Sequence, residues 1–367
     1  KEFTVEPEDF EFYEKIKVPT PTFCPECRMI RRMCFRNEHF LYKRKDSLTG
    51  EIIFSTFSEL SPIKVYKKDY WWSDQWDPMD YGQDYNWNKS FFEQFRELSL
   101  EVPWFSRSIM NLVNSDYCAN ASDLKNCYLL FDSGPDTENC AYGAMVNYSK
   151  DSFDNYQLHS SELCYDCFMV YKSYRIFFSA HCYNCQDVYF SQNLNNCQNC
   201  FACVNLRNRQ YYIFNQPYLK KEYFQKLKKF NIGSYKNTLE FIQKLKEFQS
   251  KFIYKNMHGK KNINVNGDYI NYSKNVSNSF MINNAEGCKY CFNLNVGPVK
   301  DSYEYNGWGE NAELIYESNQ TGNNIFRLKF CFMCYPNDYD LEYCIMCVSS
   351  SNLFGCVGLR HKQYCIL

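Results

Sequence analysis

The feature of this sequence that most restricts its fold is a step of three residues between small or apolar positions. One stretch reads Leu158, Ser161, Cys164, Cys167, Val170 and Ser173. A step of three drifts by about 60° per repeat around a helix of 3.6 residues per turn, so these side chains cannot share one helical face. Short pieces rich in Tyr, Phe, Val and Ile, separated by Asn, Ser and Asp, are instead typical of strands joined by tight turns.

The step of three occurs in two regions, which we call the first array and the second array. In the first array, the pair Cys164 and Cys167 recurs 18 residues on as Cys182 and Cys185, and again as Cys200 and Cys203. The pattern slips at residues 134–136, which we interpret as a loop insertion. The second array follows the same rule from Ile270 to Leu294 and from Leu341 to Leu359.

The ends of the two arrays also match. Cys203-Val-Asn-Leu-Arg207 parallels Cys356-Val-Gly-Leu-Arg360, which indicates an internal duplication. We therefore predict a mainly β fold with two β-solenoid (β-helix) arrays of 18-residue coils, in which each Cys stacks over the next. Handedness and oligomeric state do not follow from the pattern.

Helical periodicity is confined to the segments outside the arrays. The segment 217–255 predicts a helix pair broken at 231–234, and Ser90 with Glu93 predicts the start of a shorter helix. The expected organisation is an N-terminal knuckle and aromatic cap (1–106), the first array (107–216), a helical connector (217–260) and the second array (261–367). Because the chain begins at Lys1 and stops within the repeat, we expect it to be a fragment of a longer product.

Composition limits the class of protein. The 41 basic and 42 acidic residues nearly cancel, which excludes a strongly basic nucleic-acid coat, and no apolar run is long enough to span a membrane. The 21 cysteines are an odd number, and the N-terminus shows no secretory signal. Both observations favour reduced thiols and a cytoplasmic location.

The cysteines of the arrays have two interpretations. Cys-x-x-Cys is half of a tetrahedral zinc site or part of an iron–sulfur site. However, the same positions of the pattern hold Ser, Ala, Leu and Val elsewhere, and metal ligands cannot be exchanged for Leu. We therefore expect the array cysteines to be buried core residues, since free Cys behaves as a small hydrophobe.

Cys24-Pro-Glu-Cys27 lies outside the arrays and has the form of half a zinc site. Cys34 and His39 are near enough in sequence to complete a set of four ligands, so we predict one zinc ion held by Cys24, Cys27, Cys34 and His39. Unligated thiols are the alternative interpretation.

Several segments together resemble a known family. They are Cys24-Pro-Glu-Cys27-Arg28, Arg36-Asn-Glu38, the stretch from Tyr70 to Asp77, the stretch from Phe91 to Phe95, and the two Cys-Val-x-Leu-Arg ends. Over nearly its whole length the chain resembles uncharacterised cysteine-repeat proteins of candidate-phyla bacteria that carry an N-terminal zinc-ribbon-like segment. The resemblance implies this architecture and no reaction.

The resemblance also marks a departure. Relatives carry further cysteines in the segments that match residues 46–49 and 67–70. This chain has Asp46, Thr49, Lys67 and Tyr70 at those places. The departure weakens the zinc hypothesis for this member.

Three further features bear on function. Five of the six Trp lie between residues 71 and 104 beside acidic residues, an arrangement that suits a sugar-binding cleft, although we favour a cap over the open end of the solenoid. The basic stretch from Arg28 to Lys45 contains Phe35, Phe40 and Tyr42 and could grip nucleic acid, although a solvated face is the commoner explanation. The carboxylates that could serve a solenoid hydrolase or lyase are Asp151, Asp154, Glu162, Asp166 and Asp187.

No phosphate loop, nucleophile elbow or histidine metal pair is present in the sequence. His181 beside Cys182 is the nearest to a catalytic pair, but adjacent strand residues point to opposite faces. We therefore expect a non-catalytic scaffold whose aromatic and Asn-rich faces bind an unknown protein or polysaccharide. The alternatives are a carbohydrate-active or carbohydrate-binding solenoid, and nucleic-acid binding through the basic knuckle.

Overall fold

The computed structural model describes residues 2–37, 39–231 and 233–367 and is mainly β, with 39% strand and 18% helix. Within each array the chain is built from triplets. Cys118, Ala121 and Leu124 are buried, and the residue before each of them has a positive φ of 50–54°. One residue of each triplet therefore points inward, and the left-handed residue before it turns the chain.

Neighbouring strands of the arrays pair in parallel, except for the antiparallel pair at Tyr212 and Pro217, and most of the first array has a register of twelve residues. Phe153 pairs with Tyr165, and Tyr165 pairs with Phe177. Four triplets therefore close one coil, and the 18-residue coil expected from the sequence is wrong. Cys182 pairs with Val170 and Leu194 and does not stack over Cys164, because a step of 18 is one and a half coils.

The strands of the first array are short. They are β5 (Ile109–Met110), β6 (Ala121–Ser122), β7 (Leu124–Lys125), β8 (Tyr128–Phe131), β9 (Thr137–Glu138), β10 (Ala141–Asn147), β11 (Phe153–His159), β12 (Tyr165–Tyr171), β13 (Tyr174–Phe177), β14 (Ala180–Tyr183), β15 (Gln186–Tyr189), β16 (Gln192–Asn195), β17 (Gln198–Phe201), β18 (Gln210–Ile213) and β19 (Gln216–Pro217). The predicted insertion adds one residue, since Tyr128 pairs with Ala141. It places Gly134 at a φ of 142°, where a Cβ would lie 2.4 Å from the Ser122 carbonyl oxygen.

The second array is less regular. Its strands are β20 (Gly259–Lys260), β21 (Ile263–Asn271), β22 (Lys274–Asn283), β23 (Ala285–Lys289), β24 (Phe292–Leu294), β25 (Val299–Lys300), β26 (Asn306–Gly309), β27 (Ala312–Glu313), β28 (Asn319–Gly322), β29 (Ile325–Lys329), β30 (Tyr339–Glu342) and β31 (Ser351–Phe354). Its register varies around twelve, from 11 residues at Ile263 and Lys274 to 14 at Ala285 and Val299.

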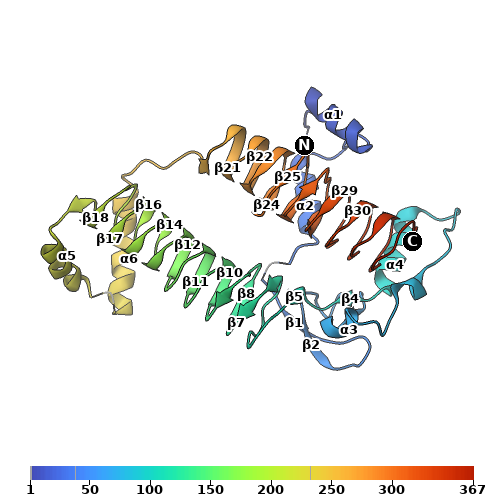
Figure 1. Ribbon diagram of the computed structural model, residues 1–367, viewed down its shortest axis with the longest axis horizontal. Coiled ribbons are helices and arrows are strands. Elements are labelled where there is room, and N and C mark those ends of the chain that lie inside the picture. The colour runs from blue at the N-terminus through green and yellow to red at the C-terminus, as the bar shows by residue number, and fades with distance from the viewer. Residues whose placement is uncertain (1, 38, 232) are drawn as a thin grey trace.

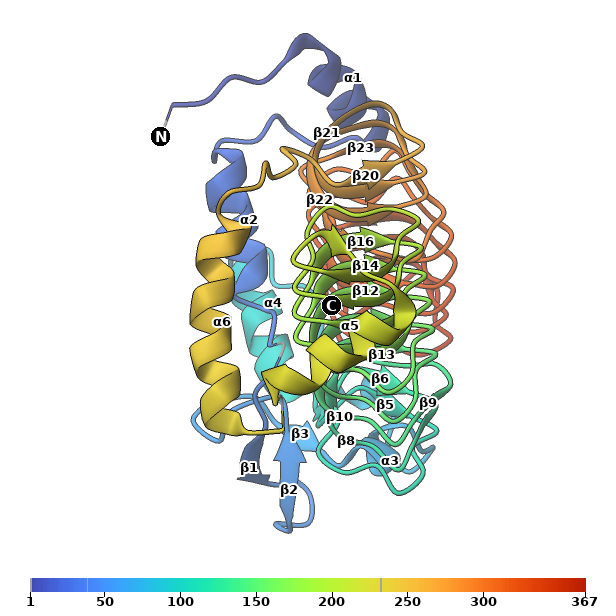
Figure 2. The same ribbon diagram turned by 90° about the vertical axis from the view of Figure 1, so that its left-hand side faces the viewer.

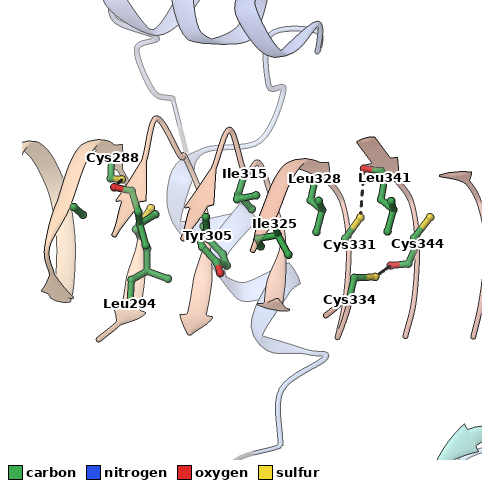
Figure 3. Close-up of a cluster of buried hydrophobic side chains, with 14 of the residues drawn as sticks. Cys288, Leu294, Tyr305, Ile315, Ile325, Leu328, Cys331, Cys334, Leu341 and Cys344 are labelled. Carbon is green, nitrogen blue, oxygen red and sulfur yellow. Dashed lines mark hydrogen bonds between the residues drawn. The ribbon is translucent and has the colours of Figure 1, made fainter. Parts of the chain in front are cut away.

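Inward Ser and Cys side chains both form hydrogen bonds with backbone groups in the core. The Ser173 hydroxyl donates to the Tyr171 carbonyl oxygen at 2.8 Å and accepts the Cys185 N–H one coil later at 3.0 Å. The Cys334 thiol likewise donates to the Cys344 carbonyl oxygen at 3.4 Å (Figure 3). A small polar group at an inward position thus pairs backbone groups that would otherwise be buried alone.

The prediction that the array cysteines are core residues is confirmed. All of them except Cys365 are buried, among Leu, Ile and Val. Burial raises the pKa of Cys140 and of Cys164 to about 12, so both thiols stay neutral. A neutral buried thiol is a filler and hydrogen-bonding group and has little reactivity.

Asn at the left-handed positions forms ladders along the outside of the coils. Asn114 donates to Asn126, Asn126 donates to Asn139, and Asn139 donates to Asp151, with distances of 2.9–3.3 Å. Asn and Asp tolerate the left-handed conformation better than other residues that have a side chain. The Asn-rich composition therefore follows from the turns of the coil and from contacts between coils.

The two arrays lie side by side and run in opposite directions. In Figure 1, the first array (green) extends from the centre to the left, and the second array (orange to red) returns from left to right. Met145 and Met169 of the first array pack with Met281 of the second, and the His181 ring stacks on those of His258 and Tyr269. The arrays thus form one contiguous body.

The predicted helical connector is confirmed. It consists of α5 (Lys220–Leu227), η2 (Lys228–Phe230) and α6 (Tyr235–Gln249). Ser234 caps α6 at the expected break, and Ile232 lies outside the described residues. In the end-on view of Figure 2, α6 and α2 lie on the same side of the coils.

The N-terminal part holds more helix than the sequence predicted. Its elements are α1 (Pro7–Ile16), α2 (Pro25–Met33), β1 (Tyr42–Lys45), β2 (Ile52–Ser55), β3 (Val65–Tyr66), α3 (Lys68–Trp71), η1 (Pro78–Tyr81), α4 (Phe91–Glu101) and β4 (Trp104–Phe105). Helix α4 begins after Ser90, as predicted. Helices α1 and α2 were missed, although each begins with Pro followed by an acidic residue, a helix-start signal.

The aromatic segment is partly buried, with Trp71 and Trp104 in the core and Trp87 exposed. Trp71 and Trp104 pack against Phe332 and Ile345 on the outer face of the last coils of the second array. Arg360 lies over the Trp71 ring at 5.5 Å and donates to the Trp71 carbonyl oxygen at 3.1 Å. The outward-facing residues of these coils are apolar, and the aromatic side chains of the N-terminal part pack against them.

Asp338 is buried at an inward position and gives a pH-dependence prediction. Burial raises the pKa of its carboxyl from 3.8 to about 8, so the folded state binds a proton that the unfolded state releases. Stability should therefore fall as the pH rises from about 4 to about 8. Asp338→Asn removes this loss, and urea denaturation should find the variant more stable than the wild type at pH 9.

Asn is a suitable replacement because Asn155 fills an equivalent place, donating to the Phe153 carbonyl oxygen and accepting the Cys167 N–H. Asp116→Asn, at an exposed carboxylate, should keep the wild-type pH dependence. An Asp338→Asn variant with the wild-type pH dependence would show that Asp338 is ionised in the folded protein.

Candidate binding groove on the first array

A groove of about 970 Å³ lies between one face of the first array and helix α6. Inward and outward residues of successive coils form its floor. Residues of α6, such as Leu245 and Lys246, form one wall. We call it the groove. Its remaining lining residues are His39, Leu129, Phe131, Tyr142, Gly143, Ala144, Asp154, Asn155, Tyr156, Asp166, Cys167, Phe168, Phe178, Ser179, Ala180, Phe190, Ser191, Gln192, Ile242 and Gln249.

One row of groove residues occupies the left-handed corner of successive coils. In chain order the row is Tyr142, Asp154, Asp166, Phe178 and Phe190, and each has a φ of 50–57°. The register places them in line, since Ala141, Phe153, Tyr165, Phe177 and Tyr189 pair in succession. The row therefore presents two carboxylates flanked by aromatic rings.

Aromatic contacts line the groove floor as well. The rings of Tyr156 and Phe168 stack with centroids 5.7 Å apart, and those of Phe178 and Phe190 stack at 4.8 Å. Tyr142 and Phe168 are 54% and 38% exposed. The groove thus offers accessible aromatic surface to a ligand.

Asp154 and Asp166 form a pair of like charges. They lie in register on adjacent coils, about 4.8 Å apart along the sheet. Burial, followed by the charge of Asp154, raises the pKa of Asp166. Within residues 2–37, 39–231 and 233–367, no ion pair involves either carboxylate.

Other carboxylates on the arrays are paired with cations one coil away. Glu138 lies 2.6 Å from Lys125, and Glu286 lies 2.8 Å from Lys274. Asp187 pairs with Arg175. Among the described residues, Asp154 and Asp166 lack the cation partner that these three carboxylates have.

Of the five carboxylates proposed from the sequence, the structure brings only Asp154 and Asp166 together. Asp151 accepts a hydrogen bond from Asn139, and the backbone of Glu162 forms β-bridges with Lys150 and Tyr174 outside the groove. The prediction that adjacent residues point apart is confirmed for His181 and Cys182, because Cys182 is in the core and His181 stacks outside it.

The proposed zinc ligands do not come together. Helix α2 places Cys27 in its first turn and Cys34 after its last residue. A rise of 1.5 Å per residue separates their backbones by about 10 Å, whereas thiolates on one zinc lie within about 4 Å of each other. His39 contacts the ring of Phe131 in the groove, with centroids 5.3 Å apart. The described part of the chain has no group of three or more His, Cys, Asp or Glu arranged to hold a metal.

Cys24 and Cys27 remain neighbours at the start of α2. The backbone N–H and the thiol of Cys27 lower the pKa of Cys24. Among the described residues no third His, Cys, Asp or Glu joins this pair, and two thiols alone do not fit a tetrahedral zinc site. The predicted knuckle is therefore a helix start.

The segments 46–49 and 67–70 meet at Asp46. Its carboxylate accepts the N–H groups of Leu48 and Thr49 at 2.8 Å and that of Lys67 at 2.5 Å. Asp46 is 3% exposed. A carboxylate thus joins the β1–β2 turn to the segment before α3 through charged hydrogen bonds.

Part of the basic stretch is buried and paired, while Lys43 and Lys45 are exposed. Arg28 and Arg32 are buried and lie 2.6 and 2.7 Å from Glu304 of the second array. Arg36 pairs with Asp132 of the first array. The expected solvated face is therefore wrong for these arginines, because α2 packs them against carboxylates that the sequence places far away.

The comparisons with known proteins add little. No family model matches the chain, and no curated protein matches it. Among solved structures, a crystal structure of a putative acetyltransferase from Desulfovibrio desulfuricans G20 is 11% identical, with a TM-score of 0.14 over 68% of this chain. The match spans 63% of that protein's length. Helices long and apolar enough to cross a membrane are not found among the described residues.

Asp46 gives a stability prediction. Asp46→Ala removes the acceptor of three backbone N–H groups and should lower the free energy of unfolding by about 2–4 kcal/mol. Asp46→Asn keeps one carbonyl oxygen and should lose less. Chemical denaturation measures both. Equal stability of the alanine variant and the wild type would show that these hydrogen bonds form equally well with water.

The zinc ligands can be tested directly. Protein purified under reducing conditions without added zinc should contain the same amount of zinc per chain, by elemental analysis, as its Cys24→Ser/Cys27→Ser variant. The reason is that α2 holds Cys34 about two turns away from this pair. Loss of about one zinc per chain in the variant would contradict the structure and restore the predicted site.

Proposed function

We propose that the two arrays are β-solenoids of twelve-residue coils and that the protein is a non-catalytic scaffold, which binds a partner in the groove of the first array. The observation that carries the proposal is the groove itself, where accessible aromatic rings surround two carboxylates that have no cation partner among the described residues. Aromatic surface with a few convergent polar groups is typical of binding sites.

The rigidity of the site supports a scaffold role. The groove residues stand on coils that share a core, and the backbone of each coil bonds to the next. Such a surface does not need to reorganise when a ligand binds, which lowers the entropy cost of binding.

A carbohydrate-active solenoid is the second candidate, and the carboxylate pair favours it. Asp154 and Asp166 stand on neighbouring paired strands, and in retaining glycosidases the acid and the nucleophile are about 5–5.5 Å apart. The raised pKa of Asp166 would suit the acid. The two proposals differ in whether a bound sugar is cleaved.

The test uses three probes with the full chain: a fluorescent arginine-containing helical peptide, neutral linear oligosaccharides, and single-stranded DNA. We expect one probe to bind without chemical change. Tyr142→Ala/Phe168→Ala should weaken that binding by at least about tenfold, since stacking on aromatic rings contributes 1–3 kcal/mol per ring in comparable sites.

The matched control is Tyr148→Ala/Phe153→Ala, which removes equally exposed rings of the same array outside the groove. It should bind like the wild type. Cleavage of an oligosaccharide that stops in Asp154→Asn would establish the enzyme instead. Failure of all three probes to bind would remove the groove as a binding site.

A further inference from the structure

The second array contains a counterpart of the acidic row of the groove. Phe190 and Tyr343 lie thirteen residues before Cys203 and Cys356, where the matching array ends begin. Counting back one coil at a time, the register aligns Phe178 with Phe330, Asp166 with Glu317, Asp154 with Glu304, and Tyr142 with Tyr290. All ten residues have a positive φ. The duplication thus produced the same aromatic and acidic row twice.

In the second array this acidic pair is covered by arginines. Arg28 and Arg32 of α2 contact the two carboxylate oxygens of Glu304, and Arg31 pairs with Glu317. The Arg28 guanidinium also lies 5.9 Å from the ring centroid of Tyr290. One helix with arginines at positions i, i+3 and i+4 therefore neutralises the pair.

In the first array the corresponding surface is open. Helix α6 packs against Phe190 and Phe201 at one end of the groove, and the acidic pair lies two to three coils away. The titratable groups around that pair are Lys246 of α6, His39, and Tyr165, whose pKa is raised by burial and by the two carboxylates.

The surroundings of the open pair differ from those of the covered one. Where Asn306 and Asn319 bond to Arg32 of α2 in the second array, the first array has Tyr156 and Phe168. A ligand bound in the groove would therefore contact these rings with a surface that is more apolar than the surface by which α2 contacts the second array.

We propose that the groove of the first array binds an arginine-bearing helix of a partner protein, seated on Asp154 and Asp166 as α2 is seated on Glu304 and Glu317. This inference rests on the proposed scaffold function and names the chemistry of its partner. Arginine fits better than lysine, because a guanidinium pairs with carboxylates in a bidentate manner and stacks on aromatic rings.

The probe is a fluorescein-labelled peptide with the sequence of residues 23–36, in which Cys24→Ser, Cys27→Ser and Cys34→Ser prevent oxidation. The peptide should not displace α2 from Glu304 and Glu317. Because α2 is part of the same chain, its effective concentration at these carboxylates far exceeds the concentration of the peptide. Fluorescence anisotropy with the full chain should show binding that weakens as salt is added.

Asp154→Asn/Asp166→Asn should raise the Kd by at least about tenfold, as should Arg28→Gln, Arg31→Gln and Arg32→Gln in the peptide. Asp116→Asn/Glu162→Gln is the matched control, because it removes two exposed carboxylates outside the groove. It should bind like the wild type. Both groove carboxylates are exposed, so the variants should keep the wild-type circular dichroism and thermal midpoint.

If the control variant loses as much affinity for the peptide as Asp154→Asn/Asp166→Asn does, the binding is general charge attraction and the inference is wrong. Unchanged affinity in Asp154→Asn/Asp166→Asn would also overturn the inference. If the peptide fails while an oligosaccharide binds in the groove, the arginine inference is wrong and the scaffold proposal stands. If neither the peptide nor the other probes bind, both the arginine inference and the scaffold proposal are wrong.

Discussion

The hydrogen bonding between successive coils is the constraint on which the rest of the structure depends. A triplet with one left-handed residue turns the chain, four triplets close a coil, and the next coil pairs with it in parallel. Inward N–H groups then face the core, where Ser and Cys side chains accept them and donate to carbonyl oxygens. The cysteines are numerous because a thiol combines small volume, apolar character and weak hydrogen bonding.

Charge determines how the parts attach to this framework. Among the carboxylates at the corners of the coils, Asp187 pairs with Arg175 one coil away, and Glu304 and Glu317 pair with the arginines of α2. The contacts of Arg28 and Arg32 with Glu304 join the N-terminal helix to a coil about 270 residues later. Burial of such a charged cluster is tolerated because each carboxylate has a guanidinium of opposite charge beside it in the folded state.

The sequence predicted the class of the fold and part of the candidate site. The mainly β arrays, their inward cysteines, the connector helices and the Ser90 cap are all local or periodic features. Asp154 and Asp166 were among five candidate carboxylates, but nothing local separated them from Asp151 or Glu162. Their separation by twelve residues is meaningful only when the coil length is known. The four proposed zinc ligands are not brought together because Pro25 and Glu26 begin a helix, which moves Cys34 away from Cys27.

The sequence by itself determined which residues face inward, because a side chain at every third position must suit a core whatever the coil length. Only the tertiary structure decided that four triplets close a coil, since steps of 12 and 18 are both multiples of three and hydrogen bonds between coils distinguish them. It also decided which acidic row α2 covers and which row stays open. That choice depends on contacts between segments hundreds of residues apart, for which the sequence carries no periodic signal.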